Sequence, residues 1–230
     1  MGSRIVATGR AVPRTALTNH DLERRLDTSD QWVRSRTGIE QRYVMVSGES
    51  LVDIAADASR IALGRAQIEP SALDAIVVGT VSSDYGFPSF ACQLQNRLGI
   101  SDIPAFDVAA ACSGFIYALS VADTSLRAGD WSRVLVVGAD ALSTMVDWED
   151  RRTAVLFGDG AGAVVLVSEP GERGVLASLL RSAGEYWDLL AVKNAGGTRY
   201  TFDAEARRPS YDAIQMRGPE LFKIAVKSME

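Results

Sequence analysis

The sequence predicts an α/β fold with a largely parallel sheet, because short β-branched apolar runs alternate with helical patterns. Four of these runs are continuous rather than alternating in apolar character, which is typical of strands buried on both faces. They lie at residues 3–9, 74–81, 133–140 and 162–169. A fifth strand is expected at 103–108, directly before a turn rich in small residues.

Three helices are expected between these strands. The first covers 50–66, with its apolar residues on one face and its charged residues on the other. The second covers 89–100 and ends at Gly99. The third begins at Cys112 and ends near Gly129.

The last sixty residues are less regular. A turn-rich break at 168–174 precedes a predicted strand at 175–186 and a polar loop at 193–212. A helix is expected over 217–230, with Pro219 in its first turn. Apolar residues still arrive at helical spacing where the sequence stops, so a chain cut in mid-domain is expected, with a naturally short terminal helix as the alternative.

Composition excludes several classes of protein. The 230 residues are 47% hydrophobic and 23% charged, as in soluble globular proteins, and the net charge of −5 argues against nucleic-acid binding. No apolar stretch approaches the roughly 20 residues of a membrane helix, and no signal peptide is evident, so a cytoplasmic location is expected. Two cysteines and one histidine make a disulfide framework or a metal site implausible. The histidine, His20, is expected at the surface of a helix start.

Cys112 is the main candidate for chemistry. A strand, a tight turn of small residues and a helix would place it at a helix N-terminus, where the N–H groups and the helix dipole favour a thiolate. Small neighbours would leave room for a substrate. Buried free cysteines are common, however, so the local pattern leaves nucleophile and core filler open. For Cys92, packing in the core or an interface is expected.

Two other motifs carry alternatives. The glycines in "FGDGAGAVVLV" fit the spacing of a dinucleotide-binding fingerprint, but a strand follows where a helix is required. A glycine-rich turn between strands is therefore expected, without a nicotinamide or flavin cofactor. The span 26–42 contains Trp32 and several arginines, including Arg36 and Arg42. These residues could stack on a base and grip phosphates, or form a solvated loop with surface ion pairs.

Several of these segments together resemble one family, the β-ketoacyl-acyl-carrier-protein synthases III, initiating condensing enzymes of type II fatty-acid synthesis in the thiolase superfamily. The resemblance extends from the first strand to the last helix, in the order of the family. The segments that carry it are "DTSDQWVRSRTGI", "FPSFACQLQNRLG", "PAFDVAAACSGFIYALSVAD", "VLVVGADALS" and "FGDGAGAVVL".

The resemblance implies a thiolase-like αβαβα fold of two similar halves, with 1–170 as the first half, 171–230 as the beginning of an incomplete second half, and a homodimer. It implies that Cys112 accepts an acyl group from an acyl-coenzyme A, with acetyl-coenzyme A as the expected starter. A carbanion from decarboxylating malonyl-acyl-carrier protein would then attack this thioester. No cofactor is expected, since acyl-coenzyme A is a substrate.

The resemblance also assigns binding residues. Trp32 and Arg151 match a pair that sandwiches the adenine of coenzyme A. The full set of positions matching coenzyme A and pantetheine contacts is Thr28, Trp32, Arg36, Arg151, Met216, Gly218 and Phe222. Phe87 matches a residue that reaches across the dimer to the partner's acyl pocket, and Leu142 and Phe157 match walls of that pocket.

The departures from the family concern the second half-reaction. The family uses a histidine and an asparagine from its C-terminal half to drive decarboxylation, and His20 lies in the first helix instead. The 230 residues alone are therefore expected to lack condensing activity. Alternatives are a related starter-loading synthase for polyketides or signalling molecules, and a non-catalytic partner of a complete synthase. Basic candidates for contact with an acidic carrier protein, or for a solvated face, are Arg207, Arg208, Arg217, Lys223 and Lys227.

Overall fold

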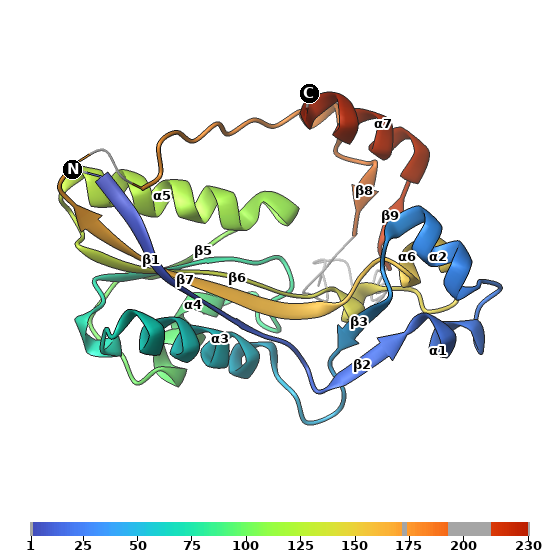
Figure 1. Cartoon of the computed structure of the whole chain (residues 1–230), viewed down its shortest axis with the longest axis horizontal. Coiled ribbons are helices and arrows are strands. Elements are labelled where there is room, and N and C mark those ends of the chain that lie inside the picture. The colour runs from blue at the N-terminus through green and yellow to red at the C-terminus, as the bar shows by residue number, and fades with distance from the viewer. Residues whose placement is uncertain (1, 172–173, 193–212, 230) are drawn as a thin grey trace, which may run out of the picture. The chain divides into compact units, whose positions relative to one another are not determined.

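The computed structural model describes residues 2–171, 174–192 and 213–229 (Figure 1). Contacts between Cα atoms divide the chain into two compact units, each built from separate segments of the sequence. The first unit consists of Met1–Arg14, Met45–Ala141 and Asp159–Leu180. The second unit consists of Thr15–Val44, Leu142–Gly158 and Arg181–Glu230. The predicted similar halves 1–170 and 171–230 stay a prediction, because these units divide the chain by contacts and not by internal similarity.

A five-stranded sheet forms the centre of the first unit. Its order is β1-β7-β6-β4-β5, and the strands are β1 Gly2–Ala11, β4 Ala75–Gly79, β5 Ala105–Val108, β6 Arg133–Ala141 and β7 Asp159–Glu169. All five predicted strands are confirmed in position. The predicted parallel character is only partly right: β4 pairs parallel with β5 and β6, but β7 pairs antiparallel with β6 and β1.

The antiparallel strands have a simple physical cause. Parallel neighbours need a crossover connection over the face of the sheet. Residues 142–158, which connect β6 to β7, belong to the second unit, so no helix of the first unit carries the chain back across the sheet at this point. Strand β7 therefore returns antiparallel beside β6. The sequence pattern could not reveal this direction, because β7 is buried on both faces like a parallel strand.

Helices cover both faces of this sheet (Figure 1). Helices α3 (Leu51–Ala66) and α4 (Phe90–Arg97) pack on the face that presents Ile76 and Val78. Helix α5 (Gly114–Ala128) packs on the opposite face, against Val77. All three strand residues are fully buried. The alternation of side chains along β4 thus supplies two separate cores, one on each side of the sheet.

Two local predictions are wrong. Residues 175–186 were expected to form a strand, but the described segment contains only the 3₁₀ helix η4 (Gly184–Tyr186). A strand needs a hydrogen-bonded neighbour, and Leu176 and Leu179 are exposed here. The glycine-rich stretch after Phe157 is not a turn between strands: Gly160 and Gly162 lie within β7, opposite Asp140 and Gly138 of β6.

The start of α5 is fixed to the sheet by glycines. A Cβ atom on Gly79, at the end of β4, would lie 2.4 Å from the carbonyl carbon of Gly114 and 2.6 Å from the amide nitrogen of Phe115. Only a glycine lets the backbone of the strand approach the helix this closely. This contact determines where α5 begins and therefore where the preceding turn lies.

The second unit is smaller and mixed. Its strands are β2 Thr15–Thr18 with β3 Gln41–Val44 and β8 Leu190–Ala191 with β9 Gln215–Met216, each an antiparallel pair. Its helical segments are α1 Asn19–Glu23, α2 Asp30–Thr37, η3 Leu142–Met145, α6 Arg151–Ala154 and α7 Gly218–Met229. Leu22, Val33 and Ala154 form part of a common apolar core, so α1, α2 and α6 pack together.

The ends of the short helices explain why they form. Thr18 and Asp21 make a capping box at the start of α1. The hydroxyl of Ser29 accepts the backbone N–H of Trp32 at 3.1 Å, and Gly38 ends α2 in the left-handed conformation with φ of 72°. His20 is exposed on α1, which confirms its predicted surface position.

The predicted polar loop at 193–212 lies outside the described residues. The predicted terminal helix is confirmed as α7. Among the residues that the structure describes, no helix has the length and apolar character required to cross a membrane.

We expect Gly79→Ala to lower the free energy of unfolding by about 1–3 kcal/mol or more. The methyl group of the alanine would clash with backbone atoms of α5, and these atoms can move only if the helix moves with them. Urea denaturation followed by circular dichroism measures the effect. The matched control is Gly162→Ala in β7, where an added Cβ meets nothing within 4 Å and a change below about 0.5 kcal/mol is expected. Equal stability losses in the two variants would contradict the proposed constraint.

Candidate active site

Cys112 lies in a short turn between a strand and a helix, as the sequence predicts. The turn is the 3₁₀ helix η2 (Ala111–Ser113), which connects the end of β5 to the start of α5. The cysteine is exposed in the described structure, so the prediction of a core filler is not supported. Cys92, in α4, is partly buried, with its Sγ 3.6 Å from the carbonyl oxygen of Ala105.

The backbone at Ala111 is strained. Its φ of 45° lies in the left-handed region, which costs a residue with a Cβ about 1–2 kcal/mol. The turn is closed by hydrogen bonds from the N–H of Ser113 to the carbonyl of Ala110 at 3.0 Å and from the N–H of Gly114 to the carbonyl of Ala111. Strain of this kind persists only where the surrounding structure imposes it. The close contact of Gly114 with Gly79 directly follows this turn and holds its C-terminal end against β4.

The electrostatics at this turn favour an anion. The start of α5 has no capping hydrogen bond from the side chain of Ser113, so this helix end keeps its partial positive charge. The nearby carboxylate of Asp107 accepts the N–H groups of Phe90 and Ala91 at 2.6 and 2.8 Å. Its charge is therefore directed at the N-terminus of α4. The sulfur of Cys112 beside this helix end is exposed enough to reach a carbonyl carbon.

The second unit brings together three of the predicted coenzyme A residues. The guanidinium carbon of Arg36 lies 4.5 Å from the centre of the Trp32 ring, and that of Arg151 lies 5.0 Å from it. Arg36 comes from α2 and Arg151 from α6, so two separate helices supply cations to one indole. Such cation–π contacts contribute about 0.5–1 kcal/mol at exposed sites. We call Trp32, Arg36 and Arg151 the tryptophan clamp.

Two further contacts border the tryptophan clamp. Arg151 donates from its Nη1 to the carbonyl oxygen of Asp27 and lies 3.5 Å from the carboxylate of the same residue. The hydroxyl oxygen of Thr28 is buried and has no hydrogen-bond partner among the described residues. Buried polar atoms are normally satisfied, so the Thr28 hydroxyl group has an unused capacity for a hydrogen bond at this position.

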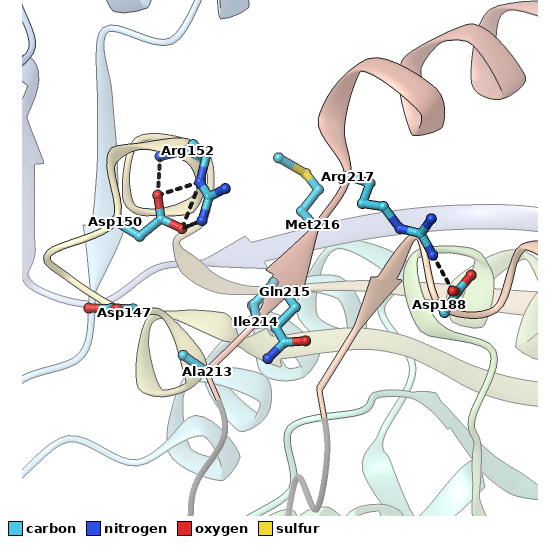
Figure 2. Close-up of a pocket in the computed structure, with 9 residues that line it drawn as sticks. All are labelled: Asp147, Asp150, Arg152, Asp188, Ala213, Ile214, Gln215, Met216 and Arg217. Carbon is cyan, nitrogen blue, oxygen red and sulfur yellow. Dashed lines mark hydrogen bonds and ion pairs between the residues drawn. The ribbon is translucent and has the colours of Figure 1, made fainter.

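A cavity of about 880 Å³ lies elsewhere in the second unit (Figure 2). Asp150 and Arg152 form a two-pronged ion pair on one side, with both N–O distances at 2.9 Å, and Arg217 pairs with Asp188 on the other. The hydrogen bond from Arg152 holds the pKa of the Asp150 carboxyl below its ordinary value. The residues that line the cavity are Asp147, Asp150, Arg152, Asp188, Ala213, Ile214, Gln215, Met216 and Arg217.

Of the three predicted pantetheine residues, two lie close together. Met216 lines the cavity from β9, and a Cβ on Gly218 would lie 3.5 Å from the Met216 methyl carbon. A Cβ at position 218 would therefore make an ordinary van der Waals contact with Met216. Phe222 is on α7 and is 70% exposed, so the described residues leave its ring available for contact.

The three predicted acyl-pocket residues are divided between the units. Leu142 and Phe157 are partly buried and pack against the core of the second unit. Phe87 belongs to the first unit and is 88% exposed. Leu142 and Phe157 thus share one apolar cluster, and the exposed Phe87 does not join them; their roles in an acyl pocket stay a prediction.

The predicted basic patch is only partly described. Arg217 is paired with Asp188, while Lys223 and Lys227 lie exposed on α7. Arg207 and Arg208 lie outside the described residues. Within the described ranges, no group of three or more histidine, cysteine, aspartate or glutamate side chains could hold a metal ion.

Sequence reasoning missed the buried polar network behind the tryptophan clamp. Arg42 is 5% exposed and Asn19 is fully buried, and the Nη2 of Arg42 donates to the Oδ1 of Asn19 at 2.8 Å. Arginine and asparagine are mostly exposed in folded proteins, so the expected place of Arg42 was a phosphate contact or a surface ion pair. A basic residue in a four-residue strand was the only available signal.

Comparison with known proteins agrees with these features. The family model described as 3-oxoacyl-[acyl-carrier-protein] synthase III matches residues 106–184, which include Cys112. Beta-ketoacyl-[acyl-carrier-protein] synthase III of Methylococcus capsulatus is 48% identical over 227 residues, covering 99% of this chain and 68% of that protein. The chain thus spans about two thirds of the length of this relative.

Solved structures show the same relationship. The crystal structure of 3-oxoacyl-[acyl-carrier-protein] synthase III from Aquifex aeolicus has a TM-score of 0.89 and 43% identity, covering 99% of this chain and 68% of that one. The priming β-ketosynthase of the R1128 polyketide pathway has a TM-score of 0.88 and 29% identity, covering 99% and 67%. The predicted thiolase-like α/β fold is confirmed. With 48% identity across nearly its whole length, this chain belongs to the β-ketoacyl-acyl-carrier-protein synthase III family.

Proposed function

We propose that Cys112 is the nucleophile that accepts the starter acyl group in the initiating condensation of fatty-acid synthesis. The family is one of acyltransferase-type condensing enzymes, and we take acetyl-coenzyme A as the starter. The observation that carries the assignment is the exposed Cys112 thiol, held by a strained turn at the uncapped start of α5. Neither feature is needed for a cysteine that only fills space.

The first half-reaction transfers the acetyl group. The Cys112 thiolate attacks the thioester carbonyl carbon of acetyl-coenzyme A, and the carbonyl electron pair moves to oxygen. As this pair returns, the bond from carbon to the coenzyme A sulfur breaks, and coenzyme A leaves as a thiolate that takes up a proton. Backbone N–H groups at the start of α5 are suited to stabilise the intermediate oxyanion.

The second half-reaction forms the carbon–carbon bond. Malonyl-acyl-carrier protein loses carbon dioxide, and the electron pair of the broken bond becomes a carbanion that attacks the acyl-Cys112 carbonyl. The bond from the acyl carbon to the Cys112 sulfur then breaks, which returns Cys112 as a thiolate and releases a β-ketoacyl product. His20, the only histidine of the 230 residues, is exposed and pairs with Glu23 at 3.1 Å. We therefore assign the acyl transfer to Cys112 and do not assign the decarboxylation to His20.

The tryptophan clamp is the proposed site for the adenine of coenzyme A. A flat base between Trp32 and Arg151 makes one stacking contact with each side chain. The Arg151 guanidinium carbon must then lie about 7 Å from the centre of the Trp32 ring. The observed 5.0 Å is too short, so Arg151 must move outward when adenine enters. The Thr28 hydroxyl supplies a hydrogen bond at the edge of the same site. Met216, Gly218 and Phe222 are proposed to contact the pantetheine arm.

The sequence comparisons favour fatty-acid synthesis over a polyketide pathway. Similarity in fold does not distinguish them, because the TM-scores of the two solved structures are nearly equal, at 0.89 and 0.88. Sequence identity does distinguish them, at 43% for the Aquifex enzyme against 29% for the polyketide priming enzyme.

A homodimer in the cytoplasm is the proposed state of the protein. The exposed Phe87 supports this assembly, since a phenylalanine ring left 88% in solvent is a candidate for burial by a second chain. We expect sedimentation analysis to give the mass of a dimer and Phe87→Asp to shift it toward the monomer. A monomeric wild-type protein at micromolar concentration would contradict this assignment.

We expect Cys112→Ala to abolish acylation by acetyl-coenzyme A, because it removes the attacking sulfur. Intact-protein mass spectrometry detects the acetyl adduct, and peptide mapping locates it. Cys92→Ala is the matched control and should retain the adduct, since Cys92 is partly buried in α4. An adduct that persists in Cys112→Ala, or that maps to Cys92, would overturn the assignment.

We expect Trp32→Ala to raise the half-saturating concentration of acetyl-coenzyme A for Cys112 acylation by about tenfold or more, since stacking of a base on an aromatic ring contributes about 1–3 kcal/mol. Trp187→Ala is the control, because Trp187 lies in the same unit and is 73% exposed. Equal half-saturating concentrations for the two variants would exclude Trp32 from the adenine site.

A further inference from the structure

Arg42 is a buried cation that has no acidic partner among the residues the structure describes. It lies in β3 and is 5% exposed, and the ion pairs formed by the described residues do not include it. Its Nε also lacks a hydrogen-bond partner. Burial lowers the pKa of the Arg42 guanidinium, although arginine remains charged in proteins.

Stability alone does not account for this arrangement. Placing a charge in a protein interior is costly, and an apolar side chain of similar volume is often as stable or more stable. The acceptors around Arg42 are neutral, so no direct ion pair offsets the desolvation. What the guanidinium provides is a rigid, planar set of donors that can hold several acceptors in fixed directions.

The acceptors of Arg42 belong to three different segments. Its Nη1 donates to the carbonyl of Leu17 at 3.2 Å, and its Nη2 donates to the Oδ1 of Asn19 at 2.8 Å and to the carbonyl of Val155 at 2.9 Å. Val155 is the residue that ends α6. The first of these bonds stays within the β2–β3 pair, and the other two reach outward to α1 and α6.

The contact with Asn19 continues to α2. The Nδ2 of Asn19 donates to the carboxylate of Asp30 at 2.9 Å and to the carbonyl of Ile39 at 2.8 Å. Asp30 is the first residue of α2 and Ile39 follows its end. Because Arg42 can only donate, the amide oxygen of Asn19 must face it and the amide nitrogen must face α2. The network therefore has a defined direction, from Arg42 through Asn19 to both ends of α2.

The chain after α6 is held against the same strand. A Cβ on Gly158 would lie 2.9 Å from the Cβ of Arg42 and 2.9 Å from the carbonyl oxygen of Tyr43. Arg42 thus contacts the end of α6 directly and reaches α2 through one side chain. These two helices carry the two sides of the tryptophan clamp, with Trp32 on α2 and Arg151 on α6.

We propose that Arg42 is a positioning residue that sets the separation of Trp32 and Arg151, and thereby the preference of the enzyme for donors that carry the adenine nucleotide. The inference rests on the proposed adenine site and extends it to a residue that does not touch the ligand. When Arg151 moves outward, Arg42 and Asn19 keep the backbones of α2 and α6 in place, so the clamp can reclose on the base.

The test compares two acetyl donors, acetyl-coenzyme A and acetyl-pantetheine, of which the second lacks the adenine nucleotide. The measured quantity is the donor preference, the ratio of their rate constants for Cys112 acylation followed by mass spectrometry. In Arg42→Gln we expect this ratio to fall about tenfold, in line with the loss of hydrogen bonds from a charged donor. Wild-type preference retained in Arg42→Gln would overturn the inference.

Further variants guard against simple loss of folding. Arg42→Lys keeps the charge but not the planar donors, and a folded Arg42→Lys variant with unchanged donor preference would also overturn the inference. Asn19→Asp keeps the acceptor for Arg42 and removes the donor to Asp30, so it should lower the ratio as well. Val44→Ala, in the same strand and outside the network, is expected to lower the unfolding midpoint without changing the ratio.

The design separates this inference from the function on which it rests. A wild-type protein that is acylated on Cys112 but shows no preference for acetyl-coenzyme A would overturn the adenine site and the role of Arg42 together. A clear wild-type preference that survives in all network variants would overturn the role of Arg42 alone.

Discussion

The close approach of Gly79 to Gly114 is the constraint on which the geometry around Cys112 depends. Because neither residue has a side chain, the end of β4 and the start of α5 meet backbone to backbone. The chain leaving β5 then has only a short distance in which to reach the helix, and Ala111 takes up the left-handed conformation there. Two glycines in the core thus constrain the turn that carries the exposed thiol of Cys112.

In the second unit, side-chain hydrogen bonds hold the helices in position. Its elements are short, and its helices are joined by hydrogen bonds from Arg42 and Asn19 rather than by close backbone contact. Hydrogen bonds are directional, whereas apolar contacts tolerate rotation and sliding, so a polar network can fix small helices that have little surface to pack. In such a network the loss of one member leaves the others buried and unsatisfied, which makes its effects strongly non-additive.

The sequence allowed much of the first unit to be predicted, because strands with continuous apolar runs and helices with one apolar face leave strong patterns. The direction of β7 could not be predicted, since burial of both faces conceals it. The strand predicted at 175–186 was wrong. Its apolar residues suggested a strand, but among the described residues no neighbouring strand pairs with this segment. Trp32 stood out in the sequence as a residue that could stack on a base, and its pairing with Arg151 came from the family resemblance. Arg42 was misplaced because its burial depends on Leu17, Asn19 and Val155, which are far apart in the sequence.

The pairing of β1 with β7 has a consequence for how the chain is made. Gly2 lies opposite Glu169 and Ala11 opposite Ala161, so β1 leaves the ribosome long before β7, the strand with which it pairs. At roughly 5–20 residues per second of synthesis, this delay lasts about ten seconds or more. Throughout that interval an apolar strand has unpaired backbone groups, and such long-range pairing folds slowly. Strand β1 is therefore open to non-native pairing until β7 has been made.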